Sequence, residues 1–276
     1  MIKTPLSVII LTYNEELNIE ACLKNIFGWA GEIFIVDNGS TDKTAEIAKN
    51  YEARIIEHED YKNQAQQFNW ALDNLKIKNE WILRLDADEY LTEELKNEIA
   101  ETLKSVPKGI NGYYMKRRGY FMGKWIRHGG YYPTWILRLF RYGKGRSEDR
   151  EMDEHIILSE GKAERLKNDF IDDNKKNLES WIFKHNNFST REARERLRGE
   201  SAGIGGQAGR KRWLKQNLYF RLPLFFRSFL YFIYRYFFRL GFLDGKEGLI
   251  FHFLQGFWHQ FLIDAKIYEK LKIEEK

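Results

Sequence analysis

The sequence predicts an α/β fold with a mostly parallel sheet, followed by a helical C-terminal extension. In the first hundred residues, apolar runs lack polar alternation, and segments with a helical pattern separate them. Continuous apolar runs are typical of strands buried on both faces, and strands joined through helices form parallel βαβ units. After residue 200 the composition becomes basic and aromatic, which indicates a different kind of structure.

The expected elements follow one another in a regular order. Strands are predicted at about 6–12, 32–37, 53–57 and 80–86, and helices at about 15–27, 42–50 and 63–76. A further helix, TEELKNEIAETL, begins after Thr92, which is a good N-cap residue. The N-terminal residues have the pattern of a strand and not of a signal peptide. The single cysteine, Cys22, excludes an internal disulfide and a cysteine-based zinc site.

Acidic and amide side chains gather where three of these strands end. In a parallel sheet, ligands bind at the carboxyl ends of the strands. The usual glycine-rich phosphate-binding loops are absent, but Mg²⁺ or Mn²⁺ could bridge carboxylates to a nucleotide's phosphates. The residues are Thr12, Tyr13, Asn14 and Glu15 after the first strand, Asp37 after the second, and Asp86, Asp88 and Glu89 after the fourth.

Three segments in this order, SVIILTYNEE, IVDNGSTDKT and LRLDADEY, resemble the family 2 glycosyltransferases of the GT-A fold. The resemblance covers roughly residues 5–160. Later segments, among them WILRLFRYGKGR and MDEHI, resemble the subgroup that builds bacterial surface polysaccharides and lipopolysaccharide core. The resemblance implies an inverting transferase that uses Mg²⁺ or Mn²⁺. It would move a sugar from a UDP-sugar to a lipid-linked or cell-surface glycan.

The resemblance also implies roles for individual positions. Asp88 would bind the metal, Asp86 would touch the ribose or a metal-bound water, and Glu89 would orient both. Arg138 could reach the donor phosphate or could be an exposed strand residue. The segment from Thr12 to Glu15 would hold the uridine.

Two positions outside the strand-four motif complete the expected donor site. Asp37 would accept a hydrogen bond from the uracil or ribose. Asn69 matches a donor-binding asparagine of the family, although Phe68 replaces the basic residue that commonly precedes it. An equal alternative for this segment is an amphipathic helix with Phe68, Ala71 and Leu72 facing inward.

Inverting transfer also needs a general base for the acceptor hydroxyl. The resemblance places an acidic residue in the segment MDEH and favours Glu154, with Asp153 also possible. Adjacent residues of a strand point to opposite faces, so only one of the two can face the sugar. Without the upstream motifs, this segment would be interpreted as a charged loop.

We expect a catalytic domain at 1–200, with a nucleotide-binding half to about 105 and an acceptor half from about 106, and an extension at 201–276. Ser189 and Glu192 form a capping-box pattern that would open a helix. In the extension, Arg227, Arg235 and Arg239 fall on one side of a helical projection. This arrangement predicts an interfacial amphipathic helix on the cytoplasmic face of the membrane. A core helix pair or an oligomer interface is the alternative.

Two other function classes fit parts of the sequence. A nucleotidyltransferase also binds metal through carboxylates, but it should carry a glycine-rich, lysine-containing loop after the first strand, where this chain has TYNEELN. A nucleic-acid-binding or lipid-binding module could use the basic tail. That function would leave the acids at three strand ends unexplained.

Overall fold

The computed structural model describes residues 3–60, 63–148, 155–198, 219 and 222–274. The chain forms two compact units. The sheet unit runs to Trp125 and continues from Tyr132 to Lys176, whereas the helical unit contains 126–131 and everything from Asn177 onward. The predicted domain boundary at residue 200 stays a prediction.

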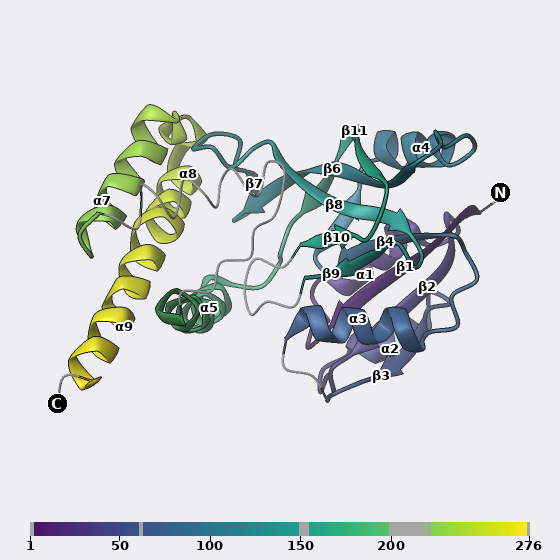
Figure 1. The fold of residues 1–276 in the computed structure, drawn as a ribbon, viewed down its shortest axis with the longest axis horizontal. Coiled ribbons are helices and arrows are strands. Elements are labelled where there is room, and N and C mark those ends of the chain that lie inside the picture. The colour runs from purple at the N-terminus through teal and green to yellow at the C-terminus, as the bar shows by residue number, and fades with distance from the viewer. Residues whose placement is uncertain (1–2, 61–62, 149–154, 199–218, 220–221, 275–276) are drawn as a thin grey trace. The chain divides into compact units, whose positions relative to one another are not determined.

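The sheet unit alternates strands and helices at first and then consists mainly of strands (Figure 1). Its elements are β1 (Thr4–Thr12), α1 (Ile19–Ile26), β2 (Ala30–Asp37), α2 (Thr44–Lys49), β3 (Arg54–Glu57), α3 (Gln64–Asn74), β4 (Trp81–Asp86), β5 (Glu89–Leu91), α4 (Glu93–Thr102), β6 (Ile110–Phe121), β7 (Lys124–Trp125), β8 (Thr134–Arg141), β9 (Gly145–Ser147), β10 (Ile156–Leu158) and β11 (Lys162–Asp172).

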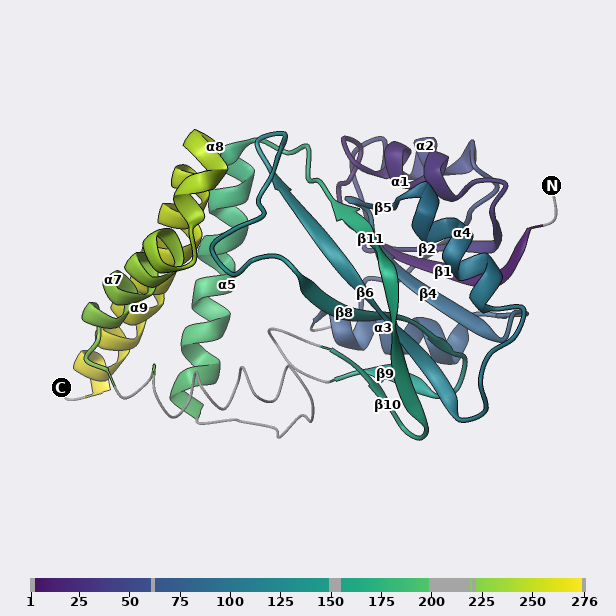
Figure 2. The same ribbon diagram turned by 90° about the horizontal axis from the view of Figure 1, so that it is seen from above.

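Most strands of this unit form a mixed sheet in the order β3-β2-β1-β4-β8-β6-β11-β5, with β7 paired to β6, while β9 and β10 form a separate two-stranded sheet. Figure 2 shows this unit from above. Strands β1 to β4 are parallel, and β8 is antiparallel to both β4 and β6. This arrangement confirms the predicted α/β fold. Because β1, β2 and β4 run in the same direction, their carboxyl ends meet at one edge, which brings the predicted site residues together.

Helices cover both faces of the sheet. On one face, α1 buries Ile19, Cys22, Leu23 and Ile26, which recur every three or four residues as the helical period requires. On the other face, α3 buries the predicted residues Phe68, Ala71 and Leu72. The inward face predicted for α3 is therefore confirmed.

The predicted cap of α4 is confirmed as well. The side chain of Thr92 accepts the backbone N–H of Leu95 at 3.2 Å. This bond satisfies a donor that the first turn of a helix otherwise leaves unpaired. The helix that follows β5 therefore begins where the sequence places it.

The helical unit consists of α5, the loop at 126–131 and a hairpin of mainly apolar helices, residues 226–274, which we call the hairpin. In the hairpin, α7 packs on η4 and α9, and α5 packs on α9. In the part of the chain that the structure describes, no helix is long and apolar enough to cross a membrane. The elements are α5 (Leu178–Arg198), α7 (Phe226–Ile233), the π-helix η2 (Tyr234–Phe238), the 3₁₀-helix η3 (Gly241–Asp244), α8 (Gly245–Phe251), the π-helix η4 (His252–Trp258) and α9 (His259–Glu274).

The predicted capping box at Ser189 is wrong. Ser189 lies inside α5, and its hydroxyl donates to the carbonyl of Asn186 at 2.7 Å. The helix begins eleven residues earlier, where Asn177 accepts the backbone N–H of Ser180 at 3.0 Å. A serine hydroxyl can satisfy itself on the preceding turn, so its spacing from a glutamate does not establish a helix start.

The predicted cationic face of the apolar helix is also wrong. Arg227 and Arg235 are 5% and 6% exposed. Arg227 Nε donates to both carboxylate oxygens of Asp264, at 2.9 and 3.0 Å, and Arg235 Nε donates to the carbonyl of Gly129 at 2.9 Å. Of the three arginines only Arg239 is exposed. Arg227 and Arg235 therefore face the protein interior, and they do not form a cationic face toward solvent.

Candidate functional site

A buried arginine compensates two of the acids at the carboxyl end of β4. Arg138 of β8 donates through Nη2 to Oδ2 of Asp86 at 2.8 Å and to Oε1 of Glu89 at 2.6 Å. The other oxygen of Glu89 accepts the backbone N–H of Asp86 at 3.0 Å. Glu89 is 1% exposed and Arg138 6%, so the interpretation of Arg138 as an exposed strand residue is wrong. Its contact with a donor phosphate stays a prediction.

The charges of this cluster depend on one another. Burial raises the pKa of Glu89 to about 8, while Arg138 opposes the rise and Asp86 adds to it. Burial alone would lower the pKa of Arg138, but Asp86 and Glu89 outweigh burial and raise it. The guanidinium therefore remains charged, and it favours the ionised form of both acids.

Removing this guanidinium should destabilise the protein strongly. In Arg138→Met, Glu89 loses its cation while remaining buried, and breaking a buried ion pair costs about 3–5 kcal/mol. Urea unfolding measures the loss, and the double variant Arg138→Met/Glu89→Gln should recover part of it. The matched control is Arg146→Met, because Arg146 pairs with Asp73 on the surface, where a pair contributes up to about 1 kcal/mol. Equal losses in Arg138→Met and the control would contradict the assignment.

The segment after β11 supports the third acid. Asn174 Nδ2 donates to Oδ2 of Asp88 at 2.8 Å, and the backbone N–H of Asp173 donates to the carbonyl of Asp88 at 2.9 Å. Lys176 reaches Oε1 of Glu15 at 2.7 Å, so the same segment also joins the end of β1. Sequence reasoning missed these residues. The only signal was a polar run, DDNKK, at the end of a strand.

The acids at the end of β4 fit a hard divalent cation without enclosing it. Asp88 is half-buried, and the Asp86 side chain is 39% exposed. Among the described residues, no group of three or more His, Cys, Asp or Glu side chains could hold a metal ion. Mg²⁺ is usually held by one or two carboxylates and completed by substrate phosphates and water. Asp88 would be the better ligand of the two, because Asp86 shares its charge with Arg138.

The ends of β1 and β2 are joined by buried hydrogen bonds. Thr12 and Asp37 are register partners, and the Thr12 hydroxyl donates to Oδ1 of Asp37 at 2.6 Å. Asp37 also accepts the backbone N–H of Ser40 at 2.7 Å and its hydroxyl at 2.6 Å. Asp37 is 3% exposed. These bonds fix the shape of both loops, while a bond from Asp37 to a nucleotide stays a prediction.

The loop after β1 presents an aromatic ring on a rigid backbone. Tyr13 is 55% exposed, and Asn14 has a left-handed φ of 53°. The Asn14 N–H donates to the Ser40 hydroxyl at 2.9 Å, and its side-chain oxygen accepts the Thr41 N–H at 2.8 Å. Glu15 is held by Lys176 and by Asn18, whose Nδ2 donates at 2.7 Å. A preformed loop with an exposed ring can hold a nucleoside without much loss of conformational entropy.

Asn69 binds the protein backbone. Its Nδ2 donates to the carbonyl of Ser147, and its Oδ1 accepts the Ser147 N–H, both at 2.9 Å. The predicted donor contact of Asn69 stays a prediction, and the observed role is to hold β9. The candidate bases Asp153 and Glu154 lie outside the described residues.

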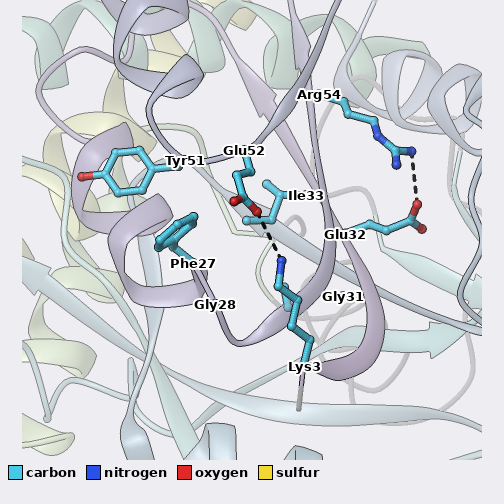
Figure 3. Close-up of a pocket in the computed structure, with 10 residues that line it drawn as sticks. Lys3, Phe27, Gly28, Gly31, Glu32, Ile33, Tyr51, Glu52 and Arg54 are labelled. Carbon is cyan, nitrogen blue, oxygen red and sulfur yellow. Dashed lines mark hydrogen bonds and ion pairs between the residues drawn. The ribbon is translucent and has the colours of Figure 1, made fainter. Parts of the chain in front are cut away.

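A cavity of about 220 Å³ lies at the opposite end of the strands (Figure 3). It is lined near the beginning of β2 by Gly31, Glu32 and residues from neighbouring segments. Two ion pairs border it, Lys3 with Glu52 at 3.3 Å and Arg54 with Glu32 at 3.1 Å. Since β2 runs from Ala30 to Asp37, this cavity is separate from the acids at the carboxyl ends.

Known proteins similar to this chain are glycosyltransferases. Lipopolysaccharide core biosynthesis glycosyltransferase LpsC of Rhizobium meliloti (strain 1021) is 30% identical over 97% of this chain and 93% of its own length. An uncharacterized glycosyltransferase of Rickettsia bellii (strain RML369-C) is 35% identical over 36% of this chain and 33% of its own length.

Among solved structures, glucosyl-3-phosphoglycerate synthase from Mycobacterium tuberculosis, in complex with Mn²⁺, UDP and glucosyl-3-phosphoglycerate, matches with 20% identity and a TM-score of 0.35. That match covers 42% of this chain and 44% of the solved one. Residues 7–217 match the family described as "Glycosyl transferase family 2", and together with the near full-length similarity to LpsC this places the chain in that family, as a glycosyltransferase.

Proposed function

We propose that this glycosyltransferase moves a sugar from a UDP-sugar to a lipid-linked or cell-surface glycan, with inversion at the anomeric carbon. The observation that carries the proposal is that β1, β2 and β4 end at one sheet edge, where Asn174 bonds to Asp88 and Lys176 bonds to Glu15. A bound Mg²⁺ or Mn²⁺ would neutralise charge that develops on the leaving diphosphate. Family membership sets aside the nucleotidyltransferase alternative.

Different residues of the site would have different roles in the reaction. The loop from Thr12 to Glu15 would hold the nucleoside, with Tyr13 available for stacking. Asp88 would face the metal, and Arg138 would keep Asp86 and Glu89 in place by hydrogen bonds that already exist. Glu154, or Asp153 beside it, would take the proton from the acceptor hydroxyl.

Two observations support the proposed class of acceptor, the name of a similar protein and the composition of the C-terminal region. The name of the R. meliloti protein assigns it to lipopolysaccharide core biosynthesis, so its similarity over nearly the whole chain supports a glycan acceptor with a lipid anchor. Residues 201–276 contain 13 Lys and Arg but 6 Asp and Glu, and residues 213–261 contain 18 aromatics. We propose that the protein works on the cytoplasmic face of the cell membrane, where such an acceptor would be presented.

A thermal-shift screen of nucleotide sugars tests the donor and the metal. UDP-sugars with Mn²⁺ should raise the melting temperature by roughly 5–10 °C at a hundredfold excess over Kd, since binding to the folded state stabilises it by mass action. The corresponding GDP-sugars, and UDP-sugars with EDTA, should give clearly smaller shifts. Equal shifts with GDP-sugars, or shifts unaffected by EDTA, would contradict the proposal. The anomeric configuration of an isolated product, determined by NMR, tests inversion.

A further inference from the structure

The helical unit carries large apolar side chains on its outside. Most of the exposed large hydrophobic residues of the described chain belong to this unit, although it is the smaller of the two. Exposed apolar surface of this extent is rare in soluble monomers and marks an interaction surface. In the hairpin these residues are Phe226, Phe229, Tyr234, Phe237, Phe238, Leu240, Phe242, Leu243, Leu249, Ile250, Phe253, Phe261, Tyr268, Leu271 and Ile273.

The interior of the same unit is rich in polar and charged groups. Asp264 is fully buried and accepts the Arg227 guanidinium, while Arg196, mostly buried, donates to Glu192 at 2.6 Å. Other buried polar residues of the unit are Ser189, Ser228, Arg235, Asp244, His252, His259 and Gln260. Proteins that are surrounded by water usually bury apolar groups and expose polar ones. This unit has the reverse arrangement, which is typical of surfaces that contact hydrocarbon.

The apolar surface extends onto the turn between α7 and α8. Phe237, Phe238, Leu240, Phe242 and Leu243 are 44–76% exposed there, and we call these five residues the apolar tip. The turn lies at the end of the hairpin opposite the C-terminus (Figures 1 and 2). Leu240 has a left-handed φ of 59°, which is strained for leucine. The backbone keeps this conformation although the Leu240 side chain is 47% exposed.

The fully exposed charged groups next to the apolar tip are cations. Within residues 234–246, the exposed charged residues are Arg239 and Lys246. The one acid of this stretch, Asp244, is 3% exposed and faces inward, where it accepts the backbone N–H of His128 at 2.9 Å and contacts its Nδ1 at 2.7 Å. The next acid along the chain, Glu247, is half-buried. Aromatic side chains whose exposed charged neighbours in the chain are cations match the interface of a bilayer with anionic headgroups.

We propose that the apolar tip inserts into the surface of a lipid bilayer and is the main element that attaches this enzyme to the membrane. The inference deepens the proposed function and rests on its assignment of a lipid-linked acceptor. Attachment is mostly apolar, because Arg227 and Arg235 are committed to Asp264 and Gly129 inside the unit. Arg239 and Lys246 add a preference for anionic lipid.

Flotation with phospholipid vesicles tests the apolar tip. The triple variant Phe237→Ser/Phe238→Ser/Phe242→Ser should lose about a hundredfold in partition coefficient, roughly fivefold for each half-exposed phenylalanine removed from the bilayer. The loss should be the same on phosphatidylcholine vesicles and on vesicles with added phosphatidylglycerol. Wild-type protein should prefer the anionic vesicles by about thirtyfold, and high salt should remove that preference while apolar binding remains.

The matched control removes apolar side chains from the far end of the hairpin. Tyr268→Ser/Ile273→Ser, at 44% and 66% exposed positions on α9, should keep binding within about threefold of wild type. Circular dichroism and melting curves of both variants verify that the fold is retained. Equal binding by the triple variant and wild type would overturn the inference, as would wild-type protein that ignores vesicles at low salt. An oligomer that the triple variant splits would identify the tip as a subunit interface instead.

Transfer to a soluble acceptor analogue is measured in parallel, so the two ideas can fail separately. Vesicle binding that depends on the apolar tip, without any sugar transfer from a UDP-sugar, would support the role of the tip and reject the proposed function. Transfer without vesicle binding would reject the tip alone. The triple variant should transfer sugar to the soluble analogue at the wild-type rate, because its substitutions lie outside the sheet unit.

Discussion

Asp88→Asn is expected to abolish metal-dependent binding of UDP and to lower turnover by roughly 10²–10⁴-fold. Coordination by a divalent cation provides several kcal/mol at the leaving diphosphate, and an amide oxygen is a poor replacement for a carboxylate. The fold should be retained, because an asparagine at this position can still accept the bond that Asn174 donates at 2.8 Å. Isothermal titration with UDP, with and without Mn²⁺, measures the first effect, and initial rates measure the second.

The matched control for this substitution is Asp73→Asn. Asp73 lies on α3, is exposed and pairs with Arg146 on the surface, so losing its charge should change neither binding nor turnover measurably. Undiminished Mn²⁺ dependence of UDP binding in Asp88→Asn would show that another residue holds the metal. The next candidate would then be Asp86, despite its bond to Arg138.

The sheet and its functional edge could be predicted because their signals are local. The apolar runs that form β1, β2, β3 and β4 are continuous, and each is followed by a polar segment. Parallel strands joined by helices must then place those segments at one edge, whatever the rest of the chain does. The bond between Thr12 and Asp37 follows from this register.

The partners of the acids could not be predicted because they are distant in the sequence. Arg138 lies 52 residues from Asp86, and Asn174 lies 86 residues from Asp88. No motif with fixed spacing links either residue to its acid, and both contacts depend on how β8 and β11 enter the sheet. The sequence therefore predicted a site that relied on metal alone to balance its acids, whereas a buried guanidinium balances two of them.

The helical unit shows a second limit of sequence reasoning. A helical projection tells which side chains share a face, and it correctly grouped Arg227 with Arg235. It does not tell which face is inward, because that depends on an acid elsewhere in the chain. Asp264, 37 residues from Arg227, decides the question here. In the alternative of a core helix pair, the large apolar side chains of this region would be buried. Many of them are exposed in the structure.

Glu154→Gln is expected to retain donor binding and to lower transfer by roughly 10²–10⁴-fold, the range typical for removal of a general base. Glutamine keeps the size of the side chain but cannot accept the proton of the acceptor hydroxyl. The described residues that flank this segment are hydrogen-bonded to one another and to α3. Strands β9 and β10 pair on either side of it, the Glu148 N–H donates to the carbonyl of His155 at 2.8 Å, and Asn69 holds Ser147 by two bonds.

Comparison with Asp153→Asn identifies the base, since neighbouring residues of an extended chain point in opposite directions. Asp153→Asn should lower transfer less than Glu154→Gln, and the reverse order would assign the base to Asp153. The control is Glu160→Gln, a surface residue that pairs with Lys144 in the sheet unit and should transfer sugar at the wild-type rate. Donor binding is measured by titration with UDP and Mn²⁺, and transfer by single-turnover rates, because only the chemical step should respond to loss of the base. If both substitutions leave the single-turnover rate unchanged, the proton acceptor lies elsewhere in the chain.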